Sequence, residues 1–272
     1  MQPLGGLILV AAACSQPPLA ISPKTVTPLV FGETFHLDSK VLRERRTINV
    51  HLPPDYATDV TTRYPILVML DGGVAEDFAH VAGDVDVSIR NEVIRPVIVV
   101  GIENIERRRD LVGPTDVAEE QAAAPHAGGA SRFREFLRTE LLPYVAAHYR
   151  TSGESALIGE SLAGLFVIET LLVEPDLFDA YIAIDPSVWW NHQAVVRGAG
   201  IAFAGWTAGP KHVVVATSEE TEMEAGVHVL ADAIAVHLPR GLTFDDLALP
   251  EEHHSTIFPI AGVRGIRLVF GR

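Results

Sequence analysis

Residues 155–166 constrain the fold more than any other part of the chain. They read Ser-Ala-Leu-Ile-Gly-Glu-Ser-Leu-Ala-Gly-Leu-Phe, so a short apolar stretch leads into Gly-x-Ser-x-Ala and then into an apolar helical pattern. A serine on a sharp strand-to-helix turn needs small residues two positions before and after it, because those positions crowd each other. Gly159 and Ala163 meet this need. The run predicts a nucleophile elbow with Ser161 as the reactive residue and the Leu162 N–H as an oxyanion donor.

Composition excludes several classes of function. The 272 residues suffice for one large α/β domain, and 21 Lys and Arg against 35 Asp and Glu give a net charge of −14. Such an acidic chain disfavours a nucleic-acid partner, which requires basic patches. A single cysteine, Cys14, excludes an internal disulfide and a cysteine-rich metal site. The sequence implies no metal and no cofactor, and it does not decide the oligomeric state.

The first fourteen residues resemble a secretion signal. Residues 1–13 are apolar and end in small residues before Cys14, which is similar to a bacterial lipoprotein signal, although positions 1–3 lack Lys and Arg. The alternative is an ordinary disordered tail. We expect a signal over 1–14, a flexible tether over 15–30 and a folded domain over 31–272. A lipidated Cys14 would place that domain outside the cytoplasm, on a membrane or in the periplasm.

The remaining pattern alternates between strands and helices, which predicts an α/β architecture. Residues 31–37 and 47–52 suggest a hairpin at the edge of the sheet. The continuous apolar runs 64–70 and 93–102 are typical of central parallel strands buried on both faces. Further strands are expected at 156–159, 180–184, 212–217 and 242–249, and helices at 132–149, 162–173, 223–238 and from about 255 onward. Residues 106–130 break the pattern and could form either a mobile lid or a plain surface loop.

A reactive serine needs a histidine base, and a carboxylate usually orients that base. In α/β-hydrolases the chain order is serine, acid, histidine, so the base should follow the last strand. Only His253 and His254 lie there. The acid should follow the strand at 212–217. Three glutamates compete at that place, and an aspartate after the strand at 180–184 is the alternative: Glu219, Glu220, Glu222 and Asp185.

The loop after the strand at 64–70 carries Gly72 and Gly73. Paired glycines allow the backbone to approach a substrate oxygen closely, so either N–H is a candidate second oxyanion donor. A simple Gly-Gly turn is the alternative interpretation.

Several segments together resemble the bacterial putative-esterase family of the α/β-hydrolase superfamily, which includes the enterochelin and ferric-siderophore esterases. They are residues 46–56, 64–72, 101–104, 107–111, 136–144, 159–166, 175–181 and 185–190. The resemblance implies an α/β-hydrolase fold with a mostly parallel sheet, helices on both faces and an antiparallel N-terminal edge. Ala163 and Thr217 replace glycines that are common in the family.

The resemblance also implies site residues. The family pattern Glu-x-His-x-Ser fits Glu251, His253 and Ser255, which favours His253 over His254. Glu220 best matches the family's acid. Trp189 and Arg109 match positions near the family's cleft, so both are expected to bind substrate.

We therefore expect a serine esterase that forms an acyl-enzyme on Ser161. Its substrate would be a small molecule, either a siderophore or a simple acyl ester. An acyltransferase on the same fold is a rival hypothesis, because it would use the same residues. A non-catalytic binding protein is a second rival, although the chain has candidates for both nucleophile and base.

Overall fold

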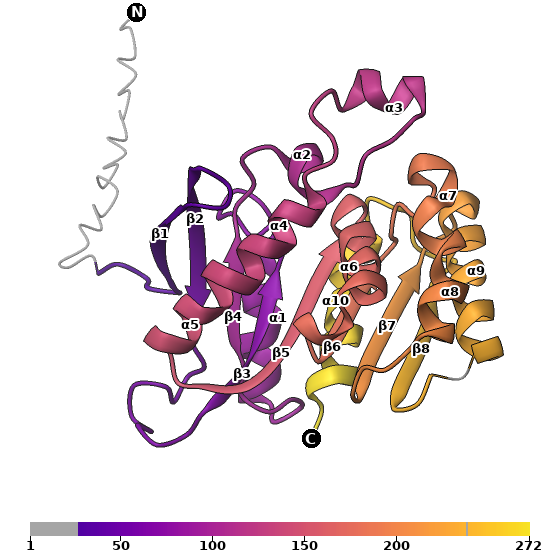
Figure 1. The fold of residues 1–272 in the computed structure, drawn as a ribbon. Helices are drawn as coiled ribbons and strands as arrows, with labels where there is room; N and C mark the ends of the chain where they lie inside the picture. Colours follow the sequence, from indigo (N-terminus) through magenta and orange to yellow (C-terminus); the bar gives the residue numbers. More distant parts are fainter. Residues whose placement is uncertain (1–26, 238) are drawn as a thin grey trace, which may run out of the picture. The chain divides into compact units, whose positions relative to one another are not determined.

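The computed structural model describes residues 27–237 and 239–272, and a sheet of eight strands runs through this part of the chain (Figure 1). The strand order is β1-β2-β4-β3-β5-β6-β7-β8. The strands are β1 (Glu33–Ser39), β2 (Glu44–His51), β3 (Tyr64–Met69), β4 (Ile98–Ile102), β5 (Thr151–Glu160), β6 (Ala180–Ile184), β7 (Lys211–Thr217) and β8 (Leu242–Ala248). β1 and β2 form an antiparallel edge, β2 is antiparallel to β4, and the strands from β4 to β8 are parallel.

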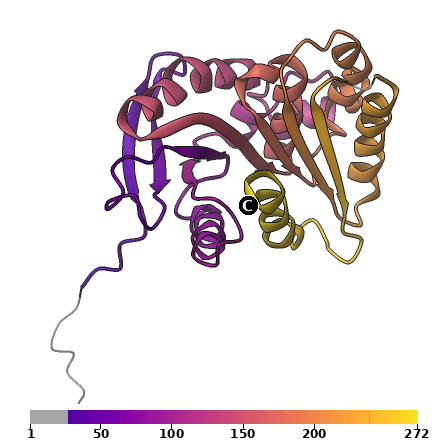
Figure 2. The same cartoon turned by 90° about the horizontal axis from the view of Figure 1, so that it is seen from below.

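Helices cover both faces of the sheet. Figure 2 shows α1 and α10 side by side on one face, and most of the other helices on the opposite face. The α-helices are α1 (Phe78–Arg90), α2 (Arg107–Leu111), α3 (Ala118–Ala123), α4 (Ala130–Phe136), α5 (Leu142–His148), α6 (Leu162–Val173), α7 (Trp190–Arg197), α8 (Ala199–Ala204), α9 (Thr221–His237) and α10 (Ile257–Phe270). The fold expected from the sequence, an α/β-hydrolase fold with an antiparallel N-terminal edge, is confirmed.

The core follows from the alternation of side chains along the parallel strands. In β3, Leu67 and Met69 pack with α1 and α10, whereas Ile66 and Val68 pack on the other face with α6. Because successive side chains of a strand point to opposite faces, a strand buried on both faces has no polar position. This explains the continuous apolar run of residues 64–70.

The register of β5 and β6 positions the site. Glu160 of β5 pairs with Ile184 of β6, so Ser161 and Asp185 each stand one residue beyond the end of a strand. The Ser161 N–H donates to the Ile184 carbonyl at 3.0 Å, and the Asp185 N–H donates to the Ala216 carbonyl at 2.7 Å. Two residues far apart in sequence are thus held on adjacent strands of one sheet.

Three expected elements differ most in their bounds. The strand expected over 156–159 is longer, since β5 begins at Thr151. The strand expected over 93–102 begins only at Ile98, because Pro96 has no N–H and the Arg95 N–H donates to the Phe270 carbonyl instead. The helix expected over 132–149 is divided into α4 and α5 by a π-helical turn, Leu137–Leu141. The sequence pattern does not predict helices α1, α2, α3, α7 and α8.

The N-terminal signal expected over 1–14, including Cys14, lies outside the described residues, as does most of the tether. Residues 31–272 cluster as one compact unit. Within the described part of the chain, no helix is both long and apolar enough to cross a membrane.

Candidate active site

The predicted nucleophile elbow is present between β5 and α6. Ser161 stands on the turn with φ 60° and ψ −120°, a conformation that is strained for a residue with a side chain. A Cβ atom at Gly159 would lie 2.7 Å from the Ala163 Cβ, so glycine is required at the first of these positions. The Leu162 N–H, at the first residue of α6, has no hydrogen-bond acceptor among the described residues. It is therefore available to an incoming oxygen.

An unbroken chain of hydrogen bonds connects Ser161 to a buried carboxylate. His254 Nε2 lies 3.1 Å from Ser161 Oγ, and His254 Nδ1 lies 2.6 Å from Asp185 Oδ2. The Asp185 side chain is fully buried. It also accepts the Ser218 N–H at 2.9 Å and the Ser218 hydroxyl at 2.8 Å. A carboxylate with three donors is fixed in orientation, and it in turn fixes the imidazole.

These contacts set the protonation of the pair. Burial of Asp185 opposes its ionisation, but the hydrogen bonds from His254 and Ser218 outweigh burial and hold the pKa of Asp185 below its ordinary value. The hydrogen bond to Asp185 raises the pKa of His254 above its ordinary value, against partial burial of the ring. Asp185 is therefore the acceptor and Nδ1 carries a proton, which leaves Nε2 of the neutral imidazole free to accept one.

The sequence preference for His253 is not matched by this geometry. His253 is 63% exposed, and its Nδ1 lies 2.5 Å from Glu219, on the surface. The two histidines are neighbours in a loop, so their side chains leave the backbone in different directions, and only His254 reaches Ser161. Glu220 makes no side-chain contact with either ring among the described contacts, and the side chain of Glu222 lies outside the described part.

The paired glycines do not present free N–H groups. The Gly72 N–H donates to the Ile102 carbonyl at 2.9 Å, and the Gly73 N–H donates to Glu76 Oε2 at 2.7 Å. The expectation that one of them is the second oxyanion donor is therefore not supported. A Cβ at Gly72 would lie 2.4 Å from the Gly101 Cα, so this glycine is required for the close approach of two backbones.

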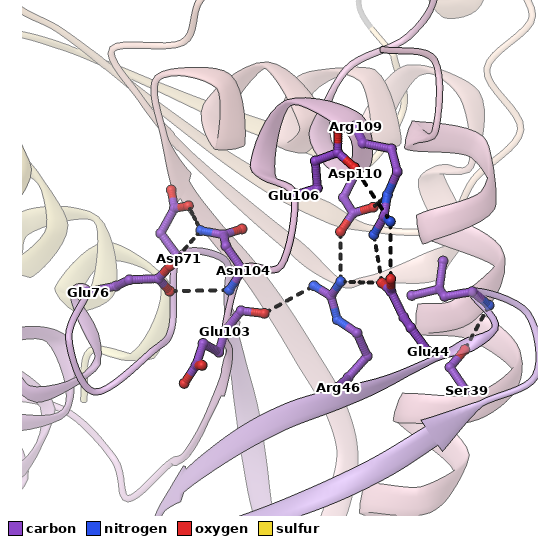
Figure 3. Close-up of polar contacts among 11 residues, drawn as sticks. Ser39, Glu44, Arg46, Asp71, Glu76, Glu103, Asn104, Glu106, Arg109 and Asp110 are labelled. Atoms are coloured by element: carbon purple, nitrogen blue, oxygen red, sulfur yellow. Dashed lines mark hydrogen bonds and ion pairs between the residues drawn. The ribbon is translucent and has the colours of Figure 1, made fainter. Parts of the chain in front are cut away.

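Polar side chains hold this loop in place. Figure 3 shows Asn104 between Asp71 and Glu76, to both of which its amide donates. Arg107 donates to both oxygens of Asp71, at 2.7 and 2.8 Å, and to the Glu160 carbonyl at 3.1 Å. Arg107 thus joins the loop after β3 to the residue that precedes Ser161.

A cavity of about 360 Å³ opens beside Ser161. Trp189 lines it, as the sequence suggested, and so do Arg107, Leu162 and Ser187. The Ser187 hydroxyl lies 3.2 Å from Ser161 Oγ. The sequence pattern marks neither Arg107 nor Ser187 as a site residue, although both lie in segments that resemble the family.

Arg109 does not line this cavity. It pairs with Glu44 at 2.6 Å and with Asp110 at 2.7 Å, and the fully buried Arg46 joins the same two carboxylates (Figure 3). The five-residue helix α2 turns Arg107 toward Ser161 and Arg109 toward the edge strands. Arg109 is therefore part of a structural ion-pair cluster rather than of the expected substrate site.

The segment 106–130, expected to be either a lid or a surface loop, contributes to the cavity. It forms α2 and α3, and α3 stands beyond the carboxyl ends of the strands (Figure 1). Glu119, Glu120 and Ala123 of α3 line the cavity. Glu120 accepts the Asn191 N–H at 3.0 Å, and the Trp190 indole N–H donates to the Gly113 carbonyl at 3.1 Å. The segment therefore covers part of the site and is bound to the residues after β6.

Within the described residues, no group of three or more His, Cys, Asp or Glu side chains is arranged to hold a metal ion. The chemistry that the site offers is that of a hydroxyl next to a neutral, carboxylate-oriented imidazole. Such an arrangement suits nucleophilic attack on a carbonyl group.

Known proteins match both the sequence and the fold. The ferri-bacillibactin esterase BesA of Bacillus subtilis is 24% identical over 251 residues, which are 82% of this chain and 85% of that protein. A siderophore triacetylfusarinine C esterase of Aspergillus fumigatus is 38% identical over 98 residues, about a third of each chain. The crystal structure of an IroE-like serine hydrolase from Shewanella oneidensis superposes with a TM-score of 0.81, at 28% identity over 88% of this chain and 80% of that one.

A family model matches residues 39–237, which is well over half of the chain, and its description is "Putative esterase". The match spans β2 to α9 and includes Ser161 and Asp185. The family resemblance that the sequence suggested is confirmed, and the chain belongs to the putative esterase family.

Proposed function

We propose that this esterase is a serine hydrolase that cleaves carboxylic esters of the siderophore type through an acyl-enzyme on Ser161. In this proposal His254 is the general base and Asp185 orients it. The observation that carries the proposal is the continuous hydrogen-bonded chain from Ser161 Oγ through His254 to the buried Asp185, next to an open cavity.

The first half of the reaction transfers the acyl group to the enzyme. His254 Nε2 takes the Ser161 proton while Oγ forms a bond to the ester carbonyl carbon, and the carbonyl oxygen becomes an oxyanion. The Leu162 N–H, at the N-terminus of α6, supplies a hydrogen bond to that oxygen. The imidazolium then protonates the leaving alcohol as the carbon–oxygen bond breaks. Asp185 stabilises the imidazolium during this step without taking its proton.

The second half releases the acid. A water molecule gives a proton to His254 Nε2 as it attacks the acyl carbon, and the second tetrahedral intermediate collapses with return of that proton to Ser161 Oγ. The products are a carboxylic acid and the alcohol of the first step, so no cofactor is consumed.

The substrate class is supported by the relatives. The B. subtilis relative carries the name of a ferri-bacillibactin esterase and spans most of this chain, and the A. fumigatus relative is likewise named for a siderophore ester. The cavity has an aromatic wall at Trp189, which suits a substrate with aromatic groups. Its charged lining is mixed, because the Arg107 guanidinium is paired with Asp71 and because Glu119 and Glu120 also line the cavity. We therefore place siderophore esters ahead of simple acyl esters.

The test compares two neighbouring histidines. Purified wild type, Ser161→Ala, His254→Gln and His253→Gln are assayed on ferri-bacillibactin and on 4-nitrophenyl butyrate, and the acid product is identified by mass spectrometry. Ser161→Ala and His254→Gln should lose at least about 1,000-fold in kcat, because nucleophile and base act as a unit. His253→Gln should stay within threefold of wild type.

Retained activity in Ser161→Ala would overturn the proposed mechanism, and so would equal losses in the two histidine variants. Cleavage of 4-nitrophenyl butyrate without cleavage of ferri-bacillibactin would overturn the proposed substrate class alone. Added acceptor alcohol should leave the free acid as the main product.

A further inference from the structure

The turn after β6 brings a second hydroxyl to the nucleophile. Ser187 is 1% exposed, and its Oγ lies 3.2 Å from Ser161 Oγ. Its N–H donates to the Ser161 carbonyl at 2.9 Å, and its carbonyl accepts the Trp190 N–H at 3.1 Å. Both ends of Ser187 are thus fixed by backbone hydrogen bonds, and its side chain is directed at the reacting atom.

The direction of the hydrogen bond between the two hydroxyls follows from the neighbouring groups. Asp185 accepts from His254 Nδ1, so Nε2 is the acceptor nitrogen and the Ser161 hydrogen points to it. Ser161 has no second hydrogen to give. In the contact between Ser161 and Ser187, the Ser187 hydroxyl must therefore be the donor.

We infer that Ser187 is a further catalytic residue, whose hydroxyl donates to Ser161 Oγ and stabilises the negative charge that grows on it during proton transfer. A hydrogen bond to a charged oxygen is roughly twice as strong as one to a neutral oxygen. The donor therefore favours the transition state over the resting state, which is the condition for acceleration. Once Oγ has become an ester oxygen, the bond to it weakens and the charge has moved to the substrate.

The same turn serves both ends of the hydrogen-bonded chain. Asp185 and Ser187 are two residues apart, with Pro186 between them, and Asp185 has a positive φ of 43°. Pro186 packs against Gly164 of α6, where an added Cβ would lie 3.0 Å from the Pro186 Cα. The carboxylate behind His254 and the hydroxyl beside Ser161 are therefore held by one rigid segment.

This inference rests on the proposed function, and its test isolates the hydroxyl. Ser187→Ala removes Oγ but keeps the backbone N–H bond to Ser161. Ser187→Thr keeps the hydroxyl. Ser88→Ala is the matched control, because Ser88 is another serine that is 1% exposed, but it belongs to α1 on the opposite face of the sheet. The probe is a fluorophosphonate, which reacts with the nucleophilic serine and needs no natural substrate.

We expect Ser187→Ala to react with the fluorophosphonate about tenfold more slowly than wild type at every pH from 5 to 9. The midpoint of the pH profile should not move, because His254 and Asp185 are unchanged. For 4-nitrophenyl butyrate, kcat should fall about tenfold while KM stays within twofold. Ser187→Thr should recover most of the rate, and Ser88→Ala should equal wild type.

A Ser187→Ala variant within twofold of wild type would overturn the inference. So would a shift in the midpoint of its pH profile, which would mean that the turn and Asp185 had moved, or a folded Ser187→Thr variant as slow as Ser187→Ala. A wild-type protein that fails to react with the probe would overturn the proposed function, and this inference with it. Normal labelling of wild type with no effect of Ser187→Ala would overturn this inference alone.

Discussion

Asp185→Asn is the substitution that tests most directly how the site is organised. The Ser218 N–H is a backbone donor with a fixed direction toward Asp185 Oδ1, so an asparagine must keep its carbonyl oxygen there. Its NH2 group then replaces Oδ2 and faces His254 Nδ1, now as a donor. The imidazole must accept at Nδ1 and carry its proton on Nε2, where it can no longer take the Ser161 proton.

The size of the loss follows from this forced tautomer. Where a buried aspartate of this kind is replaced by asparagine, kcat falls by about 10,000-fold while the geometry is retained. We expect a loss of 1,000- to 10,000-fold here on the same reasoning, with KM within about threefold. Removal of the charge also lowers the pKa of His254 toward its ordinary value, so the acid limb of the remaining activity should move to lower pH.

Steady-state kinetics on 4-nitrophenyl butyrate from pH 5 to 9 measures both effects, and a thermal melt shows that the variant is folded. Glu219→Gln and Glu220→Gln are the controls, because these glutamates follow β7, where the acid of this fold was expected. Both should stay within threefold of wild type. The reasoning is refuted if folded Asp185→Asn keeps more than a tenth of the wild-type kcat, or if either glutamine variant loses more than Asp185→Asn.

Three further predictions concern a buried glutamate, two glycines and two arginines. Burial raises the pKa of Glu160 to about 7, above its value in the unfolded chain, so this group costs stability increasingly as pH rises toward 7. Glu160→Gln should therefore raise the free energy of unfolding by about 2 kcal/mol at pH 8 and leave it unchanged at pH 4, as measured by urea titration. In the same assay Gly72→Ala should lower the free energy of unfolding by about 3 kcal/mol, because the added Cβ would meet the backbone at Gly101. Gly83→Ala should raise the free energy of unfolding by about 1 kcal/mol, because Gly83 lies in the middle of α1 with open space around its Cα. Arg107→Ala should lower kcat/KM at least about tenfold, because Arg107 lines the cavity. Arg109→Ala should lower the melting temperature and leave KM within twofold. A raised KM in Arg109→Ala with an unchanged melting temperature would contradict the assignment of Arg109 to the structural cluster.

Local sequence was enough to predict the elements that form the centre of the sheet. The strand at Ala180–Ile184 and the helix at Leu162–Val173 were predicted with their observed bounds. The flanking Asp-Pro and Gly-x-Ser sequences mark where these apolar runs end or begin. The elbow followed for the same reason, since the need for Gly159 and a small residue at 163 is local. By contrast, α7 contains three residues with positive φ, Asn191–Gln193, and no sequence pattern predicts that helix.

The partners of Ser161 could not be fixed in this way, because they depend on distant backbone. The local pattern Glu-x-His-x-Ser favours His253, but the path of the loop decides which side chain reaches Ser161. The hydrogen bond from the Glu219 N–H to the Glu252 carbonyl holds that loop at the end of β7. The sequence favours a glutamate after β7 as the carboxylate that orients the histidine. In the structure the register of β5 and β6 places Asp185, after β6, next to His254. Whether the Gly72 N–H is free depends on Ile102, thirty residues away in sequence.

The residues of the Ser161–His254–Asp185 chain lie in segments that differ in local stability. Ser161 and Asp185 end two central strands, so separating them requires the sheet to come apart. His254 belongs to the loop between β8 and α10. Two backbone hydrogen bonds join this loop to the end of β7, from the Leu249 N–H to the Thr217 carbonyl and from the Glu219 N–H to the Glu252 carbonyl. The loop can open without separating the two central strands, and local openings of this kind cost less than global unfolding. We therefore expect a ligand that bridges Ser161 and His254 to stabilise the loop more than the sheet.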